Sequence, residues 1–260
     1  MSKSIQFKIE NKIAYITLNR PEVFNSFNRE MALSLQNTLD DCETNAEVRA
    51  IVLSGNGKAF CAGQDLKEVT DPELNPGFKK ILEEHYNPII TRIRAIKKPI
   101  IGAINGVAAG AGANIALACD IVVAHNKVSF IQAFSLIGLV PDSAGTFFLP
   151  RLIGFQKAQA LAMLGDKIGA EEAEKMGMIY KCVTLDEFDD NINKLALKLA
   201  NMPTKALGFI KELFNQSMTN TLYEQLALES KLQIEAAQSE DYKEGVAAFI
   251  EKRKPNFKGR

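Results

Sequence analysis

The chain begins with alternating apolar and polar positions and then changes to a helical repeat. Residues 5–10 and 13–18 each alternate with a period of two, and the polar pair Asn11-Lys12 separates them, which predicts a β-hairpin. Asn28 stands just before a stretch whose apolar residues recur every three to four positions. Because an asparagine can cap the free N–H groups at a helix start, this stretch predicts a helix over residues 29–43.

Short apolar runs alternate with loops and helical patterns through the middle of the chain. The runs predict strands at residues 50–54, 100–104, 120–124 and 128–130. Helical patterns occupy residues 78–96 and the stretch that ends at Ala118, while the prolines and glycine of residues 71–77 predict a mobile loop. Strands that alternate with helices indicate an α/β fold.

Strand patterns nearly vanish after Gln156. The remaining apolar periodicity predicts helices at residues 157–164, 170–176, 185–200, 203–216, 221–237 and 241–251. We therefore expect a core over residues 1–152 and an all-helical region over residues 153–260. Part of the apolar surface of these late helices is expected to meet another subunit, on the stripe of Leu222, Leu226, Leu232 and Ile234.

The two most informative segments are rich in small residues and follow predicted strands. Residues 60–66 read FCAGQDL, and residues 108–113 read AAGAGA. Small side chains at strand-to-helix turns leave backbone N–H groups uncovered. Two such loops can each direct one N–H group at a single oxygen atom, which is the arrangement of an oxyanion hole. The sequence thus predicts an enzyme that stabilises the enolate of a thioester.

Composition argues against several other classes of protein. The 260-residue chain is 47% hydrophobic and 24% charged, and its 31 Lys and Arg balance 31 Asp and Glu. This balance gives no sign of binding to nucleic acid or to a membrane surface. Residues 100–119 carry no charge over a membrane-spanning length, but glycines and asparagines divide them into strand, turn and helix. The polar N-terminus lacks a secretion signal, so we expect a cytoplasmic protein.

Cysteine and histidine form no recognisable metal or catalytic cluster in the sequence. His85 and His125 lie far apart without partners at metal spacing, which favours structural roles. A Ser-His-Asp hydrolase has little support because no G-x-S-x-G elbow occurs. Free thiols in a reducing compartment are predicted for Cys42, Cys61, Cys119 and Cys182.

Five motifs connect the chain with a known family. They are residues 18–21 (LNRP), 60–66, 104–112 (INGVAAGAG), 139–143 (LVPDS) and 244–249 (EGVAAF), the last followed by Lys252-Arg253. With them the chain resembles the crotonase superfamily of enoyl-CoA hydratases and isomerases over essentially its whole length. The subgroup that looks closest isomerises 1,2-epoxyphenylacetyl-CoA in the phenylacetate pathway, and the similarity lies in residues 59–66, 86–88 (YNP), 133–135 (AFS), 138–141 (GLVP) and 149–151 (LPR).

The resemblance implies a spiral of ββα turns with a helical trimerisation region, in a homotrimer or a dimer of trimers. It also implies an acyl-CoA thioester substrate, so that coenzyme A enters as part of the substrate, with no separate cofactor and no metal. The implied oxyanion donors are the backbone N–H groups of Gln64 and Ala111, so a side-chain change such as Gln64→Ala should matter little. The substrate contacts that it implies are Phe24, Ser26, Ala62, Asp65, Leu66, Asn114 and Phe134.

Three acid–base positions of the family decide which reaction is expected. Typical hydratases carry glutamates at the positions of Asn114 and Phe134, and neither residue found here exchanges a proton near neutral pH. The resemblance instead assigns proton transfer to Asp142, the position used by dienoyl-CoA and phenylacetate-pathway isomerases. A lone carboxylate suits the removal of a proton at one carbon and its return at another.

Each of these residues also has a simpler interpretation. Asp142, within Pro-Asp-Ser, can cap the helix that follows, and Asp65 is better explained as holding its loop than as a base. Asn114 can cap or pack within its helix, and Phe134 can be either core or an apolar wall that keeps water from the enolate. A solvated helix end, rather than a contact for CoA phosphates, is expected for the basic cluster of Arg92, Arg94, Lys97 and Lys98.

We therefore expect an acyl-CoA isomerase that shifts a double bond or opens a ring epoxide, with Asp142 as the proton shuttle. An enoyl-CoA hydratase is the first alternative, and it requires water to be activated without the usual glutamates. A non-catalytic acyl-CoA-binding subunit is an alternative of another class. A hydrolase or decarboxylase of the same superfamily also stays open.

Overall fold

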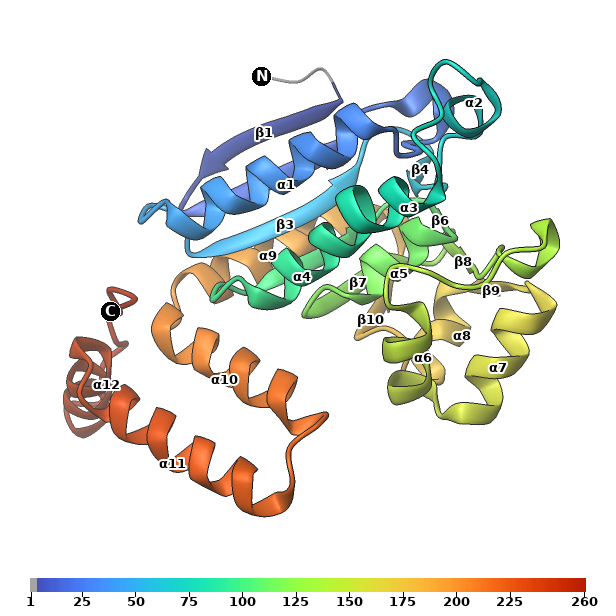
Figure 1. The fold of residues 1–260 in the computed structure, drawn as a ribbon. Helices are drawn as coiled ribbons and strands as arrows, with labels where there is room; N and C mark the ends of the chain where they lie inside the picture. The colour runs from blue at the N-terminus through green and yellow to red at the C-terminus, as the bar shows by residue number, and fades with distance from the viewer. Residues whose placement is uncertain (1–3) are drawn as a thin grey trace.

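The computed structural model describes residues 4–260, which form two β-sheets surrounded by helices (Figure 1). One sheet has the strand order β1-β2-β3-β5-β7-β10, and the other has the order β4-β6-β8-β9. The pairs β1–β2 and β8–β9 run antiparallel, and the other neighbouring strands run parallel. The strands are β1 (Ile5–Glu10), β2 (Ile13–Leu18), β3 (Ala50–Gly55), β4 (Ala59–Cys61), β5 (Ile100–Ile104), β6 (Val107–Ala109), β7 (Ile121–His125), β8 (Ser129–Ile131), β9 (Lys167–Gly169) and β10 (Lys181–Val183).

Twelve α-helices are assigned within the described residues. They are α1 (Arg29–Thr44), α2 (Leu66–Thr70), α3 (Phe78–Lys80), α4 (Asn87–Ala95), α5 (Ala111–Leu117), α6 (Gly145–Ile153), α7 (Phe155–Leu164), α8 (Ala170–Lys175), α9 (Phe188–Ala200), α10 (Thr204–Ser217), α11 (Leu222–Ala237) and α12 (Glu240–Ile250). A π-helical turn, η2 (Ile81–Tyr86), joins α3 to α4, and 3₁₀ turns lie at η1 (Pro21–Val23), η3 (Ser135–Ile137) and η4 (Leu185–Glu187).

Local sequence signals account for the first elements. Asn11 and Lys12 both adopt left-handed backbone angles, with φ of 51° and 64°, as a two-residue hairpin turn requires. The Asn28 side chain accepts a hydrogen bond from the N–H of Met31 and so caps α1. The predicted hairpin and the predicted capped helix are both confirmed.

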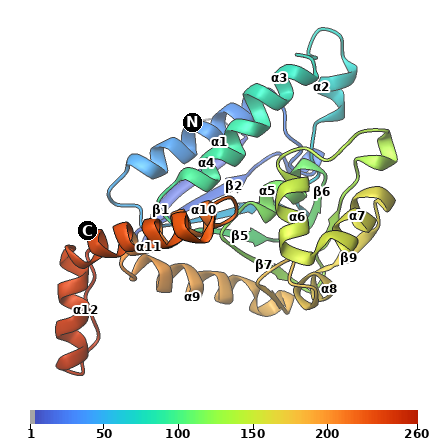
Figure 2. The same cartoon turned by 60° about the horizontal axis from the view of Figure 1, so that its bottom comes forward.

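The six-stranded sheet lies between two helical layers (Figure 2). Alternate residues of β3 point to opposite faces: Ile51 and Leu53 join the cluster that includes α1 and α4, while Ala50 and Val52 join the cluster that includes α9. Because both faces of this parallel sheet are covered, its strands are continuous apolar runs, which is why they could be predicted from sequence.

The chain passes repeatedly from one sheet to the other, as β3 to β4, β5 to β6 and β7 to β8, with helices after each pair. This is the expected spiral of ββα turns, and the α/β fold class is confirmed. Since β4, β6 and β8 are parallel neighbours, their carboxyl ends meet at one edge of the smaller sheet.

Two strands in the second half of the chain were not expected. β9 pairs with β8, and β10 pairs with β7, so both sheets receive strands from beyond residue 153. Each of these strands has three residues, which is too short to show an alternating pattern. The expectation of an all-helical region is therefore wrong at Lys167–Gly169 and Lys181–Val183, while the division at residue 152 stays a prediction about domains.

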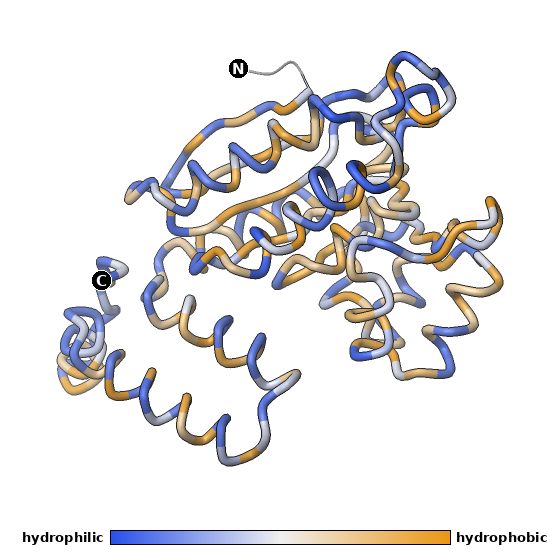
Figure 3. The backbone as a smooth tube through the Cα atoms, viewed as in Figure 1, coloured by the Kyte–Doolittle hydropathy of each residue, from blue (hydrophilic) through white to orange (hydrophobic). Residues whose placement is uncertain are grey.

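Helices α10 to α12 extend away from the sheets as an arm (Figure 1). Polar and apolar segments alternate along these helices (Figure 3), and large apolar side chains are exposed on the arm, among them Phe214, Leu222, Leu226, Ile234 and Phe249. The buried ammonium group of Lys211 attaches α10 to the core through Asp120 at 2.8 Å and the carbonyl of Ile93 at 2.6 Å. No helix within residues 4–260 combines the length and hydropathy needed to cross a lipid bilayer.

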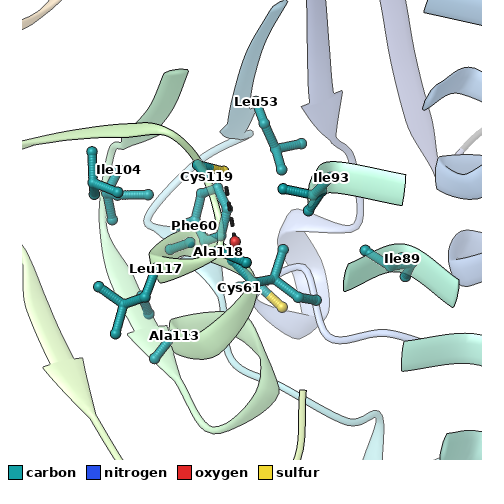
Figure 4. Packing of buried hydrophobic residues seen from close by; sticks show 14 of the residues in the cluster. Leu53, Phe60, Cys61, Ile89, Ile93, Ile104, Ala113, Leu117, Ala118 and Cys119 are labelled. Atoms are coloured by element: carbon teal, nitrogen blue, oxygen red, sulfur yellow. Dashed lines mark hydrogen bonds between the residues drawn. The ribbon is translucent and has the colours of Figure 1, made fainter. Parts of the chain in front are cut away.

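Beneath the smaller sheet, small and aliphatic side chains pack closely around Phe60 and Cys61 (Figure 4). The Cys119 thiol lies in the same cluster and donates to the carbonyl of Ile115. All four cysteines are free, as predicted, and burial raises the pKa of Cys42, Cys61 and Cys119 to about 12. These three thiols are therefore protonated packing groups at neutral pH.

Candidate active site

The candidate site lies where the carboxyl ends of β4, β6 and β8 meet. Gln64 follows β4, Ala111 follows β6, and Phe134 follows β8. Register pairs Cys61 with Ala108 and Ala109 with Ile131, so the segments that leave the three strands begin side by side. Residues that lie far apart in the sequence are thus brought to one edge of the smaller sheet.

Main-chain hydrogen bonds fix the direction of the Gln64 N–H group. Phe27 donates to the carbonyl of Gly63 at 2.7 Å and accepts from the N–H of Asp65 at 2.8 Å. Since the N–H and C=O of one peptide plane point in opposite directions, the Gln64 N–H points away from Phe27. A Cβ placed on Gly63 would lie 3.6 Å from the nitrogen of Ala111, so the backbone next to Gln64 lies close to this second nitrogen. The structure therefore brings the two predicted donors together.

The N–H group of Ala111 belongs to the first residue of α5. Gly110 precedes it with φ of 53°, a left-handed turn that directs the chain from β6 into the helix. Within residues 4–260, neither this N–H nor that of Gln64 donates to another protein group. Two free donors at the end of parallel strands, one of them at a helix start, can bind a developing negative charge.

Asp142 is mostly buried, and burial raises its pKa to about 6, against a smaller lowering by the Ser143 hydroxyl, which donates to it at 2.9 Å. The alternative interpretation of Asp142 as a helix cap is wrong. Ser143 and Ala144 take positive φ angles, so α6 begins only at Gly145, and the Asp142 side chain caps nothing. Among residues 4–260, only the Ser143 hydroxyl is hydrogen-bonded to its carboxyl group.

A pair of buried amides holds the backbone next to this carboxylate. Asn114 Nδ2 donates to the carbonyl of Asp142 at 2.8 Å, and Gln132 Nε2 donates to Asn114 Oδ1 at 2.8 Å. Gln132 was not expected at the site. Asn114 is buried one turn into α5, so this amide connects the helix of the Ala111 donor with Asp142.

An apolar cavity of about 440 Å³ opens beside Asp142. It runs between η3, α6 and α7, and Gln132 and Pro141 lie at its wall. Phe134 is buried, and its ring tip lies 3.8 Å from the position of a Cβ on Gly110. The apolar residues that line the cavity, besides Pro141, are Leu139, Val140, Leu149, Pro150, Phe155, Ala158, Ala162 and Met163.

The remaining predicted contacts divide into exposed and structural residues. Phe24 and Leu66 are exposed, and the N–H of Ala62 donates to the carbonyl of Phe24 at 3.0 Å, so these residues lie near the Gln64 loop. Ser26 is buried and donates to Val23. Asp65 is also buried: it accepts from Arg20 at 2.7 Å and caps α2 through the N–H of Lys67. This geometry agrees with the structural interpretation of Asp65.

Besides Gln132, the sequence interpretation missed Tyr86 and Glu68 at the site. The hydroxyl of Tyr86 donates to Gln64 Oε1 at 2.8 Å, and Gln64 Nε2 donates to Glu68 Oε2 at 2.7 Å. A tyrosine on an apolar helical stripe looks like core, and its direction here depends on the π-helical turn η2, which residue periodicity does not reveal.

The two histidines and the residues of the basic cluster make contacts that stabilise the fold. His85 and His125 are both buried and contact Arg29 and the carbonyl of Asn105, respectively. The basic cluster is not a freely solvated helix end: Arg92 pairs with Asp40, Arg94 with Asp120, Lys97 with Glu212, and Lys98 donates to three carbonyls at the C-terminal end of α1. No group of three His, Cys, Asp or Glu residues in the described part of the chain is arranged to hold a metal ion.

Comparisons with known proteins agree with this architecture. The sequence profile of the enoyl-CoA hydratase/isomerase family matches residues 8–260. A Rhodobacter capsulatus protein named "Probable enoyl-CoA hydratase" is 45% identical over 257 residues, which cover 99% of this chain and 98% of the relative. The 1,2-epoxyphenylacetyl-CoA isomerase of Escherichia coli is 44% identical over 262 residues, which cover 100% of both chains.

A solved structure shows the same fold. The enoyl-CoA hydratase from Bacillus anthracis superposes with a TM-score of 0.92 at 31% identity, and the match covers 99% of this chain and 100% of that one. The family profile and the relatives both extend over almost the entire chain. The chain therefore belongs to the enoyl-CoA hydratase/isomerase family, within the crotonase superfamily, and is an enzyme of that superfamily.

Proposed function

We propose that this enzyme is an acyl-CoA isomerase that works through a thioester enolate. The observation that carries the proposal is Asp142, a carboxyl group with a pKa raised to about 6, whose backbone is hydrogen-bonded to Asn114 of α5, the helix that begins at the Ala111 donor. A base with a pKa near the working pH is ionised often enough to take a proton and protonated often enough to return it.

The reaction follows from these groups. The thioester oxygen accepts from the N–H groups of Gln64 and Ala111, which stabilise the negative charge that develops on it. The Asp142 carboxylate removes a proton from a carbon of the acyl chain, and the electron pair of that C–H bond moves into the conjugated enolate. Asp142 then returns the proton at another carbon of the same system, so the double bond moves and the composition does not change.

Hydration is less well supported by the residues at the site. Water addition in this family would use acid–base groups at positions 114 and 134, which here are an amide and a phenyl ring. Asn114 is also occupied, because it donates to the carbonyl of Asp142 and accepts from Gln132. Phe134 offers only apolar surface, which disfavours an ordered attacking water.

The apolar cavity is the proposed site of the acyl group. Its volume of about 440 Å³ is within the usual range for small-molecule pockets. Pro141, the residue before Asp142, lies in its wall, so an acyl chain in the cavity passes close to the carboxylate. The lining suits a medium-length unsaturated chain or an apolar ring, and the opening of a ring epoxide would use the same enolate chemistry.

Product mass separates the candidate reactions. The protein is incubated with trans-2- and trans-3-enoyl-CoAs of six to ten carbons and with ring-epoxidised phenylacetyl-CoA. We expect a product of unchanged mass with altered absorbance. A product heavier by one water would instead show a hydratase, release of free CoA would show a hydrolase, and no change with any substrate would favour a binding subunit.

Asp142→Asn tests the assigned base. The variant keeps the shape of the side chain but cannot carry the proton, so turnover should fall about 100-fold or more while acyl-CoA binding is retained. Asp241→Asn is the matched control, since Asp241 is a buried carboxylate that accepts from the N–H groups of Lys258 and Gly259 in the C-terminal tail. An Asp142→Asn enzyme with the wild-type rate would exclude Asp142 as the proton shuttle.

We also propose a homotrimer or a dimer of trimers that assembles through the arm. The exposed apolar residues of α10 to α12 support this, as does Phe249, which is 86% exposed at the end of α12 and could reach a neighbouring site together with Lys252. Light scattering at micromolar concentration should give three or six times the chain mass of 28.6 kDa. A monomer under these conditions would contradict the proposal.

A further inference from the structure

We infer that the side chain of Gln64 is a positioning element for its own backbone N–H, held by Tyr86 on one side and Glu68 on the other. The inference rests on the proposed function, because it assigns these residues to the geometry of the oxyanion hole. It also replaces the expectation that the Gln64 side chain is dispensable.

The two hydrogen bonds leave the amide only one orientation. The Tyr86 hydroxyl lies 2.8 Å from Gln64 Oε1, and Gln64 Nε2 lies 2.7 Å from Glu68 Oε2. Burial raises the pKa of Tyr86 well above its usual value, so its hydroxyl stays protonated and can donate. The carboxylate of Glu68 can only accept, so a flipped amide would turn its oxygen toward this carboxylate and lose that contact.

Both partners of Gln64 are themselves fixed. Tyr86 is 0% exposed, and its ring packs edge-on against Phe27 at a centroid distance of 5.9 Å. Glu68 is buried in α2, and its second oxygen accepts from the N–H of Arg29, the first residue of α1, at 2.8 Å. The amide of Gln64 is therefore anchored to α1, α2 and the π-helical turn η2.

The anchored side chain restrains the peptide plane that carries the donor. This plane joins Gly63 to Gln64, and Gly63 has φ of 95°, a conformation from which glycine can move with little steric cost. The hydrogen bond from Phe27 to the Gly63 carbonyl holds one end of the plane. Tyr86 and Glu68, which together form a clamp on the Gln64 side chain, hold the other end of the plane. The N–H of Gln64 therefore keeps its direction when the thioester oxygen binds.

Three variants test the clamp through turnover. Tyr86→Phe removes one hydroxyl and should lower kcat about 10-fold, and Gln64→Ala should lower it about 10- to 100-fold, because small displacements of a donor cost this much. KM should change much less. If Tyr86 acts through Gln64, adding Tyr86→Phe to Gln64→Ala should cause little further loss. Tyr15→Phe is the matched control, because it removes a hydroxyl that contacts Asn193 on the far side of the sheet.

A direct spectroscopic signal separates positioning from a general loss of structure. The carbonyl stretch of bound [1-¹³C]octanoyl-CoA, a saturated thioester that cannot isomerise, should shift to lower frequency in the wild type and in Tyr15→Phe. The shift should be smaller in Tyr86→Phe and Gln64→Ala. Tyr86→Phe should also keep the pH profile of the wild type, since Tyr86 transfers no proton in this account.

The outcomes are distinct from those that test the proposed function. A wild type that polarises the probe carbonyl but isomerises nothing would contradict the isomerase and leave the clamp intact. Full polarisation and full turnover in Gln64→Ala or in Tyr86→Phe would overturn the clamp. The loss of one limb of the pH profile in Tyr86→Phe would overturn it too, because Tyr86 would then be a proton-transfer group. If Gln64→Ala fails to fold, Tyr86→Phe, which lacks only one oxygen atom, still tests the clamp.

Discussion

The Gln64 loop (residues 61–65) and the Asp142 segment (residues 135–144) form opposite sides of the site and are held in different ways. The loop has main-chain hydrogen bonds to Phe27 on both sides of Gln64. In the segment, the apolar side chains of Leu136, Ile137 and Val140 are exposed, with Val140 at 80%. Amide and main-chain hydrogen bonds to the carbonyl of Asp142, from Asn114 and Gly145, hold the segment near the carboxylate.

The difference matches what each side has to do. A hydrogen-bond donor acts on one atom and is effective only if its direction is set before the substrate arrives. A proton shuttle serves two carbons, so its backbone has to be placed while its carboxyl group stays free of strong partners. Rigid support of the donors therefore belongs in one mechanism with an Asp142 that Asn114 and Gly145 hold through its backbone carbonyl.

The largest effect should come from removing a donor on the rigid side. Ala111→Pro deletes one N–H group, and turnover should fall about 100- to 1000-fold, as for other lost oxyanion donors. Proline is tolerated at the first position of a helix, so α5 should survive. Glu240→Pro places the same change at the first position of α12 and should leave kcat unaltered. A folded Ala111→Pro enzyme with full turnover would remove Ala111 from the site.

A smaller loss of turnover is expected when the hydrogen bond from Asn114 to the Asp142 carbonyl is disturbed. A Cβ on Gly145 would lie 2.3 Å from Asn114 Nδ2, so Gly145→Ala has to displace the amide that holds the Asp142 carbonyl. Turnover should fall about 10- to 100-fold, since misplaced catalytic groups are costly. Gly169→Ala is the control because nothing lies within 4 Å of its Cβ position. Equal kcat values in Gly145→Ala and Gly169→Ala would show that turnover does not need the hydrogen bond from Asn114 to Asp142.

The pH dependence of kcat/KM tests the role of Asp142 in the unaltered protein. Burial raises the pKa of Asp142 to about 6, and the ionised form is the base, so kcat/KM should fall as the pH drops through this value. Between pH 7 and pH 5 the loss should be about 10-fold, with a slope of one at the acid end. The residual activity of Asp142→Asn should lack this limb. A wild-type rate that is flat down to pH 4 would assign the proton to another group.

The smallest effect concerns stability. Because the folded-state pKa of Asp142 lies above the usual 3.8, the folded protein binds this proton more tightly than the unfolded chain does. The cost of burying the carboxylate is therefore absent below about pH 4 and complete above about pH 6. At pH 7, Asp142→Asn should raise the free energy of unfolding by about 1–2 kcal/mol, after allowance for partial exposure. Urea titrations at pH 7 and pH 4 should show this gain at the higher pH alone.

Much of the secondary structure could be predicted from local sequence, because its helices and strands are long or have clear turn and capping residues at their ends. The hairpin at Asn11-Lys12, the cap at Asn28 and the apolar strands β3, β5 and β7 depend on a few neighbouring residues. The three-residue strands β9 and β10 form only because a partner strand lies beside them, and no local pattern announces them.

The residues of the site show the same difference between local signals and contacts made only in the folded chain. Small residues after two strands predicted an oxyanion hole in these loops, and the resemblance to the crotonase superfamily implied the individual donors, Gln64 and Ala111. The cap at Asp142 was wrong because Ser143 and Ala144 adopt left-handed angles that delay α6, which non-glycine residues rarely do. The contacts of Tyr86 with Gln64 and of Asn114 with Asp142 join residues that are 22 and 28 positions apart, so they exist only in the folded chain.

The π-helical turn at Ile81–Tyr86 limits how this enzyme can vary in chain length. A π turn holds one residue more than the α-helical repeat, and that residue sets the rotation of α3 relative to Tyr86 and α4. Deleting one residue within Ile81–Glu84 would restore a regular helix and turn the segment before the deletion by about 100°, as one residue does in a helix of 3.6 residues per turn. Single-residue deletions should therefore be selected against here, whereas the exposed loop at residues 71–77 should accept them.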